Sequence, residues 1–561
     1  MRVLIATAGI LLALTVGAPV ARADAGSAKG SKAVLGAPTN DGLPEWHVTT
    51  LTVAPPGFST TALEAMHAAE ATPTMQGVHR RQHPLTVVPL DFEGQHWMVD
   101  FYYQRHLVAE AEVTSTGRVT GVYTGPVAIA VYARGHFLPL FDSPWVVGVF
   151  SLLFLLPFVD PRRLWRMATL DALAVLSFLA SYGLFNSVHL EAGIWLAYPP
   201  LLYLAGRMAW IGFGRSRHRG EESARPPVIS NGLLAAGLLA LIAGRVALGI
   251  ASHAISDVGV SSLVGAHRII DGLPLYYAGS GHADTYGPIA YLAYVPFVSL
   301  FSLSTAAKSA AIAFDLVTVA GLLALGVRLH GGRRGRRLGL LLAWGWAACP
   351  FTLLALMMHT NDGLIAMLSV LALLVFASPG ARGAMLGLAT AAKFSPGVLL
   401  PLFASPAGRG RKATVACVAA FAVVVVTAIG LSLPAGGIRE FYDHTIGYQL
   451  GRSDVFSPWA LHPGLKPFAR AIEVAVLALA AAVGFVPRRR SVIQVSALAA
   501  MLIIAVQLPA IHWFYYYIVW FMPFVLVALL AGPRSGAAEG QRELADVVPV
   551  PEAPEEILVP V

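Results

Sequence analysis

Charged side chains are scarce in this chain of 561 residues: Asp, Glu, Lys and Arg together make up 12% of it. Soluble domains typically carry about 25%. Hydrophobic residues make up 56%, and the mean hydropathy is +0.66. This composition excludes a soluble globular protein and predicts a polytopic α-helical membrane protein. The net charge of +8 does not indicate nucleic-acid binding, because the arginines cluster in short loops between apolar runs, where they orient spans and contact anionic lipid.

Cysteine is almost absent. Cys349 and Cys417 are the two in the sequence, and both lie in apolar segments far apart along the chain, so we expect packing residues without a disulfide or metal framework. The sequence also has no zinc-ligand spacing, Walker-type phosphate loop, nucleophile elbow or dinucleotide fingerprint. Soluble-nucleotide chemistry on the inner face is therefore disfavoured.

The N-terminal segment is typical of a secretory signal. It has a basic start, a long apolar run and a small-x-small end at Ala21-Arg22-Ala23. We interpret residues 1–23 as a signal peptide, with an uncleaved anchor as the alternative. Both interpretations place the residues that follow outside the cytoplasm.

Residues 24–143 form the sizeable polar stretch of the chain and predict a small α+β domain. A Thr116-Gly117 step is a hairpin turn signal between its last two strands. A helix, a strand with a tryptophan and an acidic strand ending in Ser-Thr-Gly-Arg-Val together resemble a PepSY-type domain. The predicted elements are a helix near Ser59–Ala71 and strands near His96–Gln104, Leu107–Ser115 and Arg118–Tyr123.

From Pro144 onward, apolar runs alternate with short basic loops, and the positive-inside rule orients them. Crossings by 288–303 or 383–404 would place the arginine clusters that follow them outside. We therefore interpret 288–303 as an outer-surface or re-entrant segment, and 383–404 as a broken helix hinged at Lys393-Phe-Ser-Pro396. The remaining spans, about eleven of roughly 20 residues each, are 144–160, 167–186, 191–207, 231–252, 306–328, 338–357, 362–378, 413–434, 468–487, 493–511 and 514–531.

This topology divides the chain into parts. Three spans and a basic cytoplasmic loop (144–230) precede a membrane core (231–532), and a tail rich in Pro, Glu and Val (533–561) is expected to be disordered and cytoplasmic. Asp257 and the long loop 435–467 then lie at the outer face of the cell membrane.

Two carboxylates stand in the outer loops that follow the span 231–252. Asp257 could act as a general base toward a hydroxyl group, or be a solvated loop residue. Asp284, just before Gly287 and Pro288, could hold a divalent cation or hydrogen-bond a sugar hydroxyl. Its alternative role is to cap the helix that begins near Pro288.

Two cations fall inside apolar segments, where charge is costly and needs a partner, a cavity or a ligand. Arg245 could contact a phosphate, and the alternative is an ion pair with Asp315 in the next predicted span. Lys393 stands beside a predicted helix break, where freed backbone amides and an ammonium suit an anionic group. The alternative for Lys393 is snorkelling toward the cytoplasmic surface.

Further polar residues fall at the predicted outer face. His359 and Asn361 open a span and could bind substrate. The alternative is that this segment is only the N-cap of the span, since Thr360, Asn361 and Asp362 all suit that role. His512 begins an aromatic stretch that also suits an interfacial belt. Arg452 in the long loop could bind sugar or phosphate, or pair with Asp454.

The order of these motifs resembles the family 87 branch of the C-type glycosyltransferase superfamily. The resemblance covers about 300 residues, 231–531, and similar actinobacterial proteins are mannosyltransferase-like membrane enzymes. It is carried by Asp257 after the first core span, Gly272-Leu-Pro-Leu-Tyr276, Tyr286-Gly-Pro288, Asn361, Lys393-Phe-Ser-Pro396 and His512-Trp-Phe-Tyr515.

The resemblance implies a helical core of the same superfamily and an inverting transfer of a hexose, often mannose. The donor would be a polyprenyl-phosphate sugar and the acceptor a lipid, glycan or protein. Asp257 would be the base, and Arg245, Lys393 or Arg452 would stabilise the departing phosphate. Asp284, Tyr286, His359, Asn361 and His512 complete the expected substrate site. No nucleotide is needed, and a divalent cation stays open as a possible cofactor.

The chain also departs from the family pattern, because three spans and a PepSY-like domain precede the core. Two other functions stay open. Broken helices with buried cations suit a transporter or flippase of a lipid-linked sugar or envelope lipid. A non-catalytic protein that binds envelope ligands through 24–143 is the third possibility.

Overall fold

The computed structural model describes most of the chain between the two ends. The expected signal peptide and C-terminal tail lie outside the described residues, as do the clustered arginines of 215–228. The described residues are 51–531 without 55–57, 84, 93–95, 104–105, 126, 129–140, 160–164, 188, 215–228, 253, 277–283, 406–409, 452–455 and 488–489.

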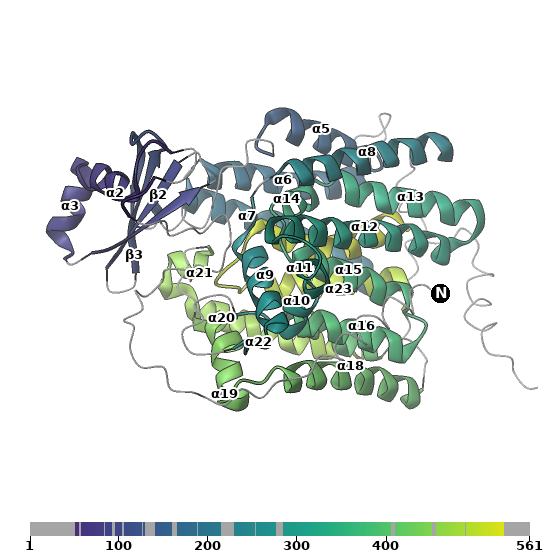
Figure 1. Ribbon diagram of the computed structural model, residues 1–561. Helices are drawn as coiled ribbons and strands as arrows, with labels where there is room; N and C mark the ends of the chain where they lie inside the picture. Colours follow the sequence, from purple (N-terminus) through teal and green to yellow (C-terminus); the bar gives the residue numbers. More distant parts are fainter. Residues whose placement is uncertain are drawn as a thin grey trace, which may run out of the picture.

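A four-stranded antiparallel sheet and two helices form a small α+β unit at one end of the helical body (Figure 1). Helix α2 starts at a capping box in which Thr61 and Glu64 exchange hydrogen bonds. Its alanines pack on one face of the sheet around Trp97, Val99 and Phe101. The elements are α2 (Ala62–Glu70), α3 (Pro73–Arg81), β1 (Thr86–Phe92), β2 (His96–Tyr103), β3 (His106–Thr114) and β4 (Val119–Thr124).

The predicted helix and three strands of this unit are confirmed to within a few residues, and so is the turn at Gly117, whose φ is +85°. Helix α3 and strand β1 were not predicted. Strand β1 contains Pro89, which normally argues against a strand, but β1 is an edge strand in the order β1-β2-β3-β4. An edge position tolerates the missing N–H of proline.

The rest of the described chain is helical, and its long helices lie side by side (Figure 1). Helix α16 packs along α18, and α12 along α13. The elements are α5 (Pro144–Leu155), α6 (Met167–Asn186), α7 (Leu190–Phe213), α8 (Asn231–Ala251), α9 (Asp257–Ile270), α10 (Pro288–Leu292), α11 (Val295–Val298), α12 (Leu303–His330), α13 (Gly332–Ala348), α14 (Pro350–Met357), α15 (Asp362–Leu374), α16 (Pro379–Ala392), η1 (Ser395–Leu399), α17 (Leu400–Ala404), α18 (Arg411–Leu431), α19 (Gly437–Tyr442), η2 (Asp443–Gly447), α20 (Tyr448–Gly451), α21 (Pro458–Leu461), η3 (Pro463–Leu465), α22 (Lys466–Val483), α23 (Val492–Gln507), η4 (Tyr515–Tyr517) and α24 (Ile518–Leu530).

Four of the described helices, α6, α8, α12 and α18, are long and apolar enough to cross a membrane. The pair α13 and α14 makes a fifth if it is one span bent by 59°. The bend falls at Cys349, just before Pro350, which has no N–H to continue the helix. Every stretch predicted as a span contains a helix, while the number of crossings and their direction stay predictions.

The two stretches interpreted as re-entrant or broken are both interrupted. Residues 288–298 form two short helices, α10 and α11, each with a proline in its first turn. Helix α16 ends at Ala392, and Lys393 adopts an extended conformation before η1 and α17 continue the chain. The predicted break at Lys393 is therefore confirmed, and it delivers this side chain to the candidate site.

Candidate active site

The ammonium group of Lys393 lies at the centre of a buried polar cluster. It forms an ion pair with Asp362, the first residue of α15. The indole Nε1 of Trp520, in α24, donates a 2.7 Å hydrogen bond to the same carboxylate oxygen. Both charged side chains are more than nine tenths buried, so each depends on the other for its ionised state.

Three aromatic rings surround the same ammonium. Its Nζ lies 5.1 Å from the ring centre of Trp520, 5.3 Å from that of Tyr286 and 6.0 Å from that of Tyr517. Each ring is within cation–π distance or at its limit. Lys393 is thus held inside the protein, and the snorkelling alternative is not what the structure shows.

Tyr286 reaches this cluster from a tightly held turn. Its backbone N–H donates to the hydroxyl of Tyr291 at 3.0 Å, and its carbonyl accepts from the hydroxyl of Tyr276 at 2.8 Å. Next to it, the N–H of Gly287 donates to the carbonyl of Ala392 at 3.1 Å. A Cβ at Gly287 would collide with a backbone oxygen of α16. Only glycine lets the turn come this close to the end of the helix that carries Lys393.

Asp284 begins the same turn and pairs with a histidine that the sequence analysis did not single out. Its Oδ2 lies 2.8 Å from Nδ1 of His444, in the π-helical segment η2. The capping alternative for Asp284 is wrong, because the N-cap of α10 is Gly287. No group of three or more His, Cys, Asp or Glu that could hold a metal ion occurs in the described part of the chain.

Asp257 is the first residue of α9, and its side chain is exposed. Ser256 caps the helix by accepting from the N–H of Gly259 at 3.2 Å. Asp257 lies within electrostatic range of the buried Tyr516, and so does Asp362 of the lysine cluster. The first turn of α9 therefore presents an accessible carboxylate.

The loop that carries Asp257 is clamped to the turn between α14 and α15. The hydroxyl of Ser252 donates to the carbonyl of Met357 at 2.7 Å, and the N–H of Ser256 donates to that of Met358 at 2.8 Å. These contacts fix the position of the first turn of α9 against the start of α15.

His359 adds to this clamp. Its Nδ1 lies 2.6 Å from the carbonyl oxygen of Ala254 and its Nε2 lies 2.9 Å from that of Gly249. The residue is fully buried and adopts a φ of +47°, which is rare outside glycine. Asn361 is buried as well and donates to the hydroxyl of Ser262 in α9 at 2.9 Å. Both residues hold the Asp257 loop, and neither side chain is on the surface.

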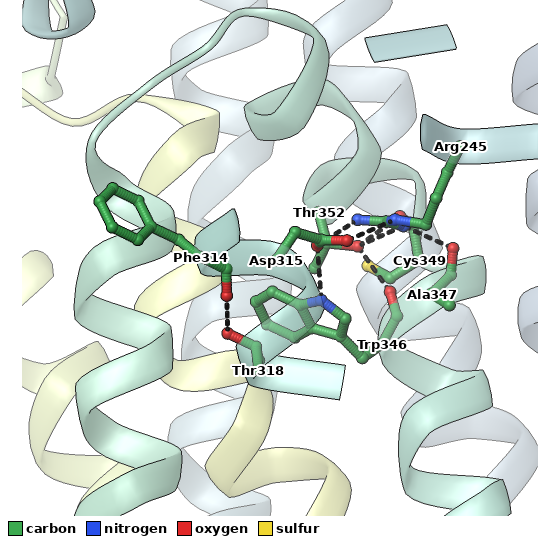
Figure 2. Close-up of polar contacts among 8 residues, drawn as sticks. All are labelled: Arg245, Phe314, Asp315, Thr318, Trp346, Ala347, Cys349 and Thr352. Carbon is green, nitrogen blue, oxygen red and sulfur yellow. Dashed lines mark hydrogen bonds and ion pairs between the residues drawn. The ribbon is translucent and has the colours of Figure 1, made fainter. Parts of the chain in front are cut away.

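Arg245 forms an ion pair with Asp315, which was the alternative to a phosphate contact. Its guanidinium is fully buried and makes two hydrogen bonds with Asp315, at 2.7 and 3.0 Å, as Figure 2 shows. Trp346 Nε1 donates to the same carboxylate at 2.8 Å, and Thr352 lies 3.4 Å from the guanidinium. This network satisfies the arginine inside the bundle, so we remove Arg245 from the expected phosphate contacts.

Contacts between aromatic rings connect His512 to the lysine cluster. Its imidazole is 4.9 Å from the ring of Phe456 and 6.2 Å from that of Tyr517, which in turn stacks on Trp520 at 4.5 Å. Arg452, and the pairing with Asp454 that was its alternative, lie outside the described residues.

Sequence reasoning missed several members of the site. Asp362 was noted as a cap candidate, yet it is the counter-ion of Lys393, and Asn361 forms no side-chain cap at α15. Trp520 looked like an ordinary apolar residue of a span. An acidic residue at the head of a long apolar run was the one available signal for Asp362.

Comparison with known proteins confirms the resemblance over part of the chain. Residues 285–511 match the model of glycosyltransferase family 87. This range contains Tyr286, His359, Asn361 and Lys393, while Asp257 precedes it. No curated protein matches the chain.

Among solved structures, the chain is similar to the crystal structure of ArnT from Cupriavidus metallidurans bound to undecaprenyl phosphate. The identity is 17% and the TM-score is 0.38. The alignment covers 56% of this chain and 62% of that chain, so this chain spans less than two thirds of the length of that relative.

Proposed function

We propose that this protein is a membrane glycosyltransferase that moves a hexose, in the first instance mannose, from a polyprenyl-phosphate donor to a lipid, glycan or protein acceptor. The reaction takes place at the extracytoplasmic face and inverts the anomeric carbon. The observation that carries the proposal is the buried Lys393 at a helix break, ringed by aromatic side chains, inside the segment that matches glycosyltransferase family 87.

Lys393 is the residue we assign to the donor phosphate. Its ammonium is paired with Asp362, and its contacts are fixed before substrate arrives. A phosphate oxygen that enters the cluster is attracted by the ammonium. In this low-dielectric environment the attraction is much stronger than in water. The rings of Tyr286, Tyr517 and Trp520 offer apolar faces that suit a sugar or an isoprenoid.

Asp257 is the residue we assign to the acceptor. As the acceptor oxygen attacks the anomeric carbon, the bond from that carbon to the phosphate oxygen breaks, and the acceptor proton passes to the Asp257 carboxylate. The polyprenyl phosphate leaves with the electron pair and is stabilised by Lys393. A carboxylate on a solvent-exposed first turn, clamped through Ser252 and Ser256, is available for this task without being mobile.

The first experiment is transfer of radiolabelled mannose from polyprenyl-phosphate mannose to acceptors in membranes that contain wild type, Asp257→Asn or Lys393→Met. Product from the wild type alone supports the donor class and the role of Asp257. It supports the role of Lys393 when thermal unfolding shows that the Lys393→Met protein is folded in the same membranes. Equal product from Asp257→Asn removes that residue from the reaction, and no product from the wild type excludes this donor.

A transporter or flippase of a lipid-linked sugar is the second candidate, favoured by the interruption of the chain at a buried cation. The same membranes distinguish the two functions. A transporter moves labelled lipid between leaflets and leaves the sugar–phosphate bond intact, whereas the transferase yields free polyprenyl phosphate.

A further inference from the structure

We infer that Asp284 and His444 form a subsite in which Nε2 of His444 accepts a hydrogen bond from a carbohydrate hydroxyl group of the donor or the acceptor. This inference rests on the proposed glycosyltransferase function. It changes the role of Asp284 from a direct substrate ligand to a residue that orients His444, and it adds His444 as a residue that touches substrate.

Burial separates the two roles. The side chain of Asp284 is 2% exposed, whereas that of His444 is 20% exposed. The carboxylate therefore lies beneath the imidazole, and the imidazole is the group that a ligand meets. Asp284 is a positioning residue in this arrangement.

The pair also fixes the tautomer of the histidine. Nδ1 of His444 lies 2.8 Å from Oδ2 of Asp284, so the Nδ1–H donates to the carboxylate. The lone pair of a neutral imidazole then remains on Nε2. Within the described part of the chain, the one contact of His444 is that of Nδ1, and Nε2 makes no hydrogen bond or ion pair. A partly exposed acceptor atom with a fixed direction is what recognition of a hydroxyl group requires.

The surroundings hold this geometry rigidly. The ring of Phe441, just before η2, meets that of Tyr276 edge to face at 4.9 Å. Tyr276 in turn donates to the carbonyl of Tyr286, two residues after Asp284. In η2, the Thr445 hydroxyl donates to the carbonyl of Phe441 at 2.6 Å. Single π-helical turns of this kind occur frequently at functional sites.

Two separate contacts connect the subsite to the lysine cluster. The turn that begins at Asp284 carries Tyr286, whose ring is 5.3 Å from the Lys393 ammonium. The ring of Phe441 lies 6.3 Å from that of Phe394, the neighbour of Lys393 in the chain. A hydroxyl group bound at His444 would therefore belong to a substrate whose phosphate or attacking oxygen lies near Lys393.

The competing explanation is that the ion pair only fastens η2 to the α9–α10 loop. Two substitutions of His444 distinguish these explanations, because each explanation predicts that a different one of the two variants is impaired more. His444→Asn retains an N–H near the position of Nδ1 and loses the distal nitrogen. His444→Gln retains a polar amide near the position of Nε2 and loses the contact with Asp284.

The experiment measures kcat and KM for the polyprenyl-phosphate mannose donor and for the acceptor in purified wild type and both variants. If Nε2 touches substrate, KM for one of the two rises about tenfold in His444→Asn and less in His444→Gln, which corresponds to about 1.4 kcal/mol. The substrate whose KM rises is the one that supplies the hydroxyl. The opposite order, or unchanged KM values in both variants, overturns the subsite.

His462 provides a matched control. It forms an exposed contact with Glu191 at 3.2 Å, and the two side chains are 46% and 66% exposed. His462→Asn should leave both KM values unchanged. If wild type transfers no sugar, the proposed function fails, and binding of the same donor and the same acceptor then decides the subsite. Weaker binding of either one by His444→Asn than by wild type supports the subsite, and equal binding of both overturns it.

Discussion

The ammonium of Lys393 and the carboxylate of Asp362 form a buried ion pair at the point where α16 ends and α15 begins, and the indole of Trp520 donates to the same carboxylate. Two segments separated by about thirty residues are joined here by opposite charges. The pair thus fixes the helix break and holds the cation that we assign to the donor phosphate.

Removal of one partner of this pair should destabilise the protein strongly. Lys393→Met leaves a buried carboxylate without its cation, and the expected loss is about 3–5 kcal/mol. Lys393→Met combined with Asp362→Leu should cost less than the sum of the single changes, since no charge is then left unpaired. Thermal unfolding in detergent measures both.

The exposed pair Arg470 and Glu473 is the control, because its side chains are 55% and 33% exposed. Arg470→Ala should change stability by about 1 kcal/mol at most. Additive effects of Lys393→Met and Asp362→Leu would show that the two groups do not depend on each other.

Asp257→Asn should reduce sugar transfer by about 10²–10⁴-fold, the usual contribution of a general base. Its thermal unfolding should match the wild type, because the side chain is exposed. Asp271→Asn, at the other end of α9 and half exposed, is the matched control and should retain full activity. A similar loss in both variants would indicate a general effect on α9.

The sequence predicted those parts of the fold that local patterns determine. Apolar length identified the helical segments, and alternation with a glycine turn identified strands β2, β3 and β4. Strand β1 was missed because Pro89 argues against a strand unless its edge position is known. That position depends on tertiary pairing.

The site was predictable only in part, for a related reason. A charge in an apolar run marked Lys393 and Arg245 as residues that need a partner, but the partner is chosen by the fold. For Arg245 the partner is Asp315, as one of the two interpretations held. For Lys393 it is Asp362, which the sequence also offered as a helix cap. The pair of Asp284 and His444 joins segments 160 residues apart, and no local pattern indicates it.

Gly287→Ala should impair transfer and stability together. A methyl group at this position meets the backbone of α16 at less than van der Waals distance, and backbone cannot move aside as a flexible side chain does. The turn would shift, carrying Tyr286 away from Lys393 and weakening the hydrogen bond from Gly287 to Ala392. Transfer assays and thermal unfolding of the variant measure the effect.

Gly244→Ala is the matched control for this change. Gly244 lies in α8, where a Cβ would meet nothing within 4 Å, and alanine is the better helix former. It should be neutral or slightly stabilising. Full activity in Gly287→Ala would show that the close approach of the turn is not needed for the reaction.

The sheet of the N-terminal unit should lose stability as pH rises. Asp100 in β2 lies directly opposite Glu110 in β3, and both side chains are buried. Burial raises the pKa of Asp100 from 3.8 to about 7, and the Tyr102 hydroxyl, 3.4 Å away, offsets this only in part. The folded protein therefore keeps a proton on Asp100 at pH values where the unfolded chain has released it.

The sign of the effect follows from proton binding. Below about pH 4 both states are protonated and the stabilisation is complete. Between about pH 4 and 7 the folded state binds more protons, so the free energy of unfolding falls with rising pH, by an amount on the order of a few kcal/mol. Above about pH 7 the curve is flat.

Asp100→Asn removes the titrating group and keeps its shape, so it should be more stable than wild type at pH 8, and the difference should become small below about pH 4. Hydrogen exchange of the β2–β3 segment in the full chain measures this, because the pH dependence of intrinsic exchange cancels when the two proteins are compared at one pH. Glu112→Gln, on the less buried part of β3, should show no such difference. If the difference in stability between Asp100→Asn and wild type stays constant with pH, Asp100 does not titrate in this range.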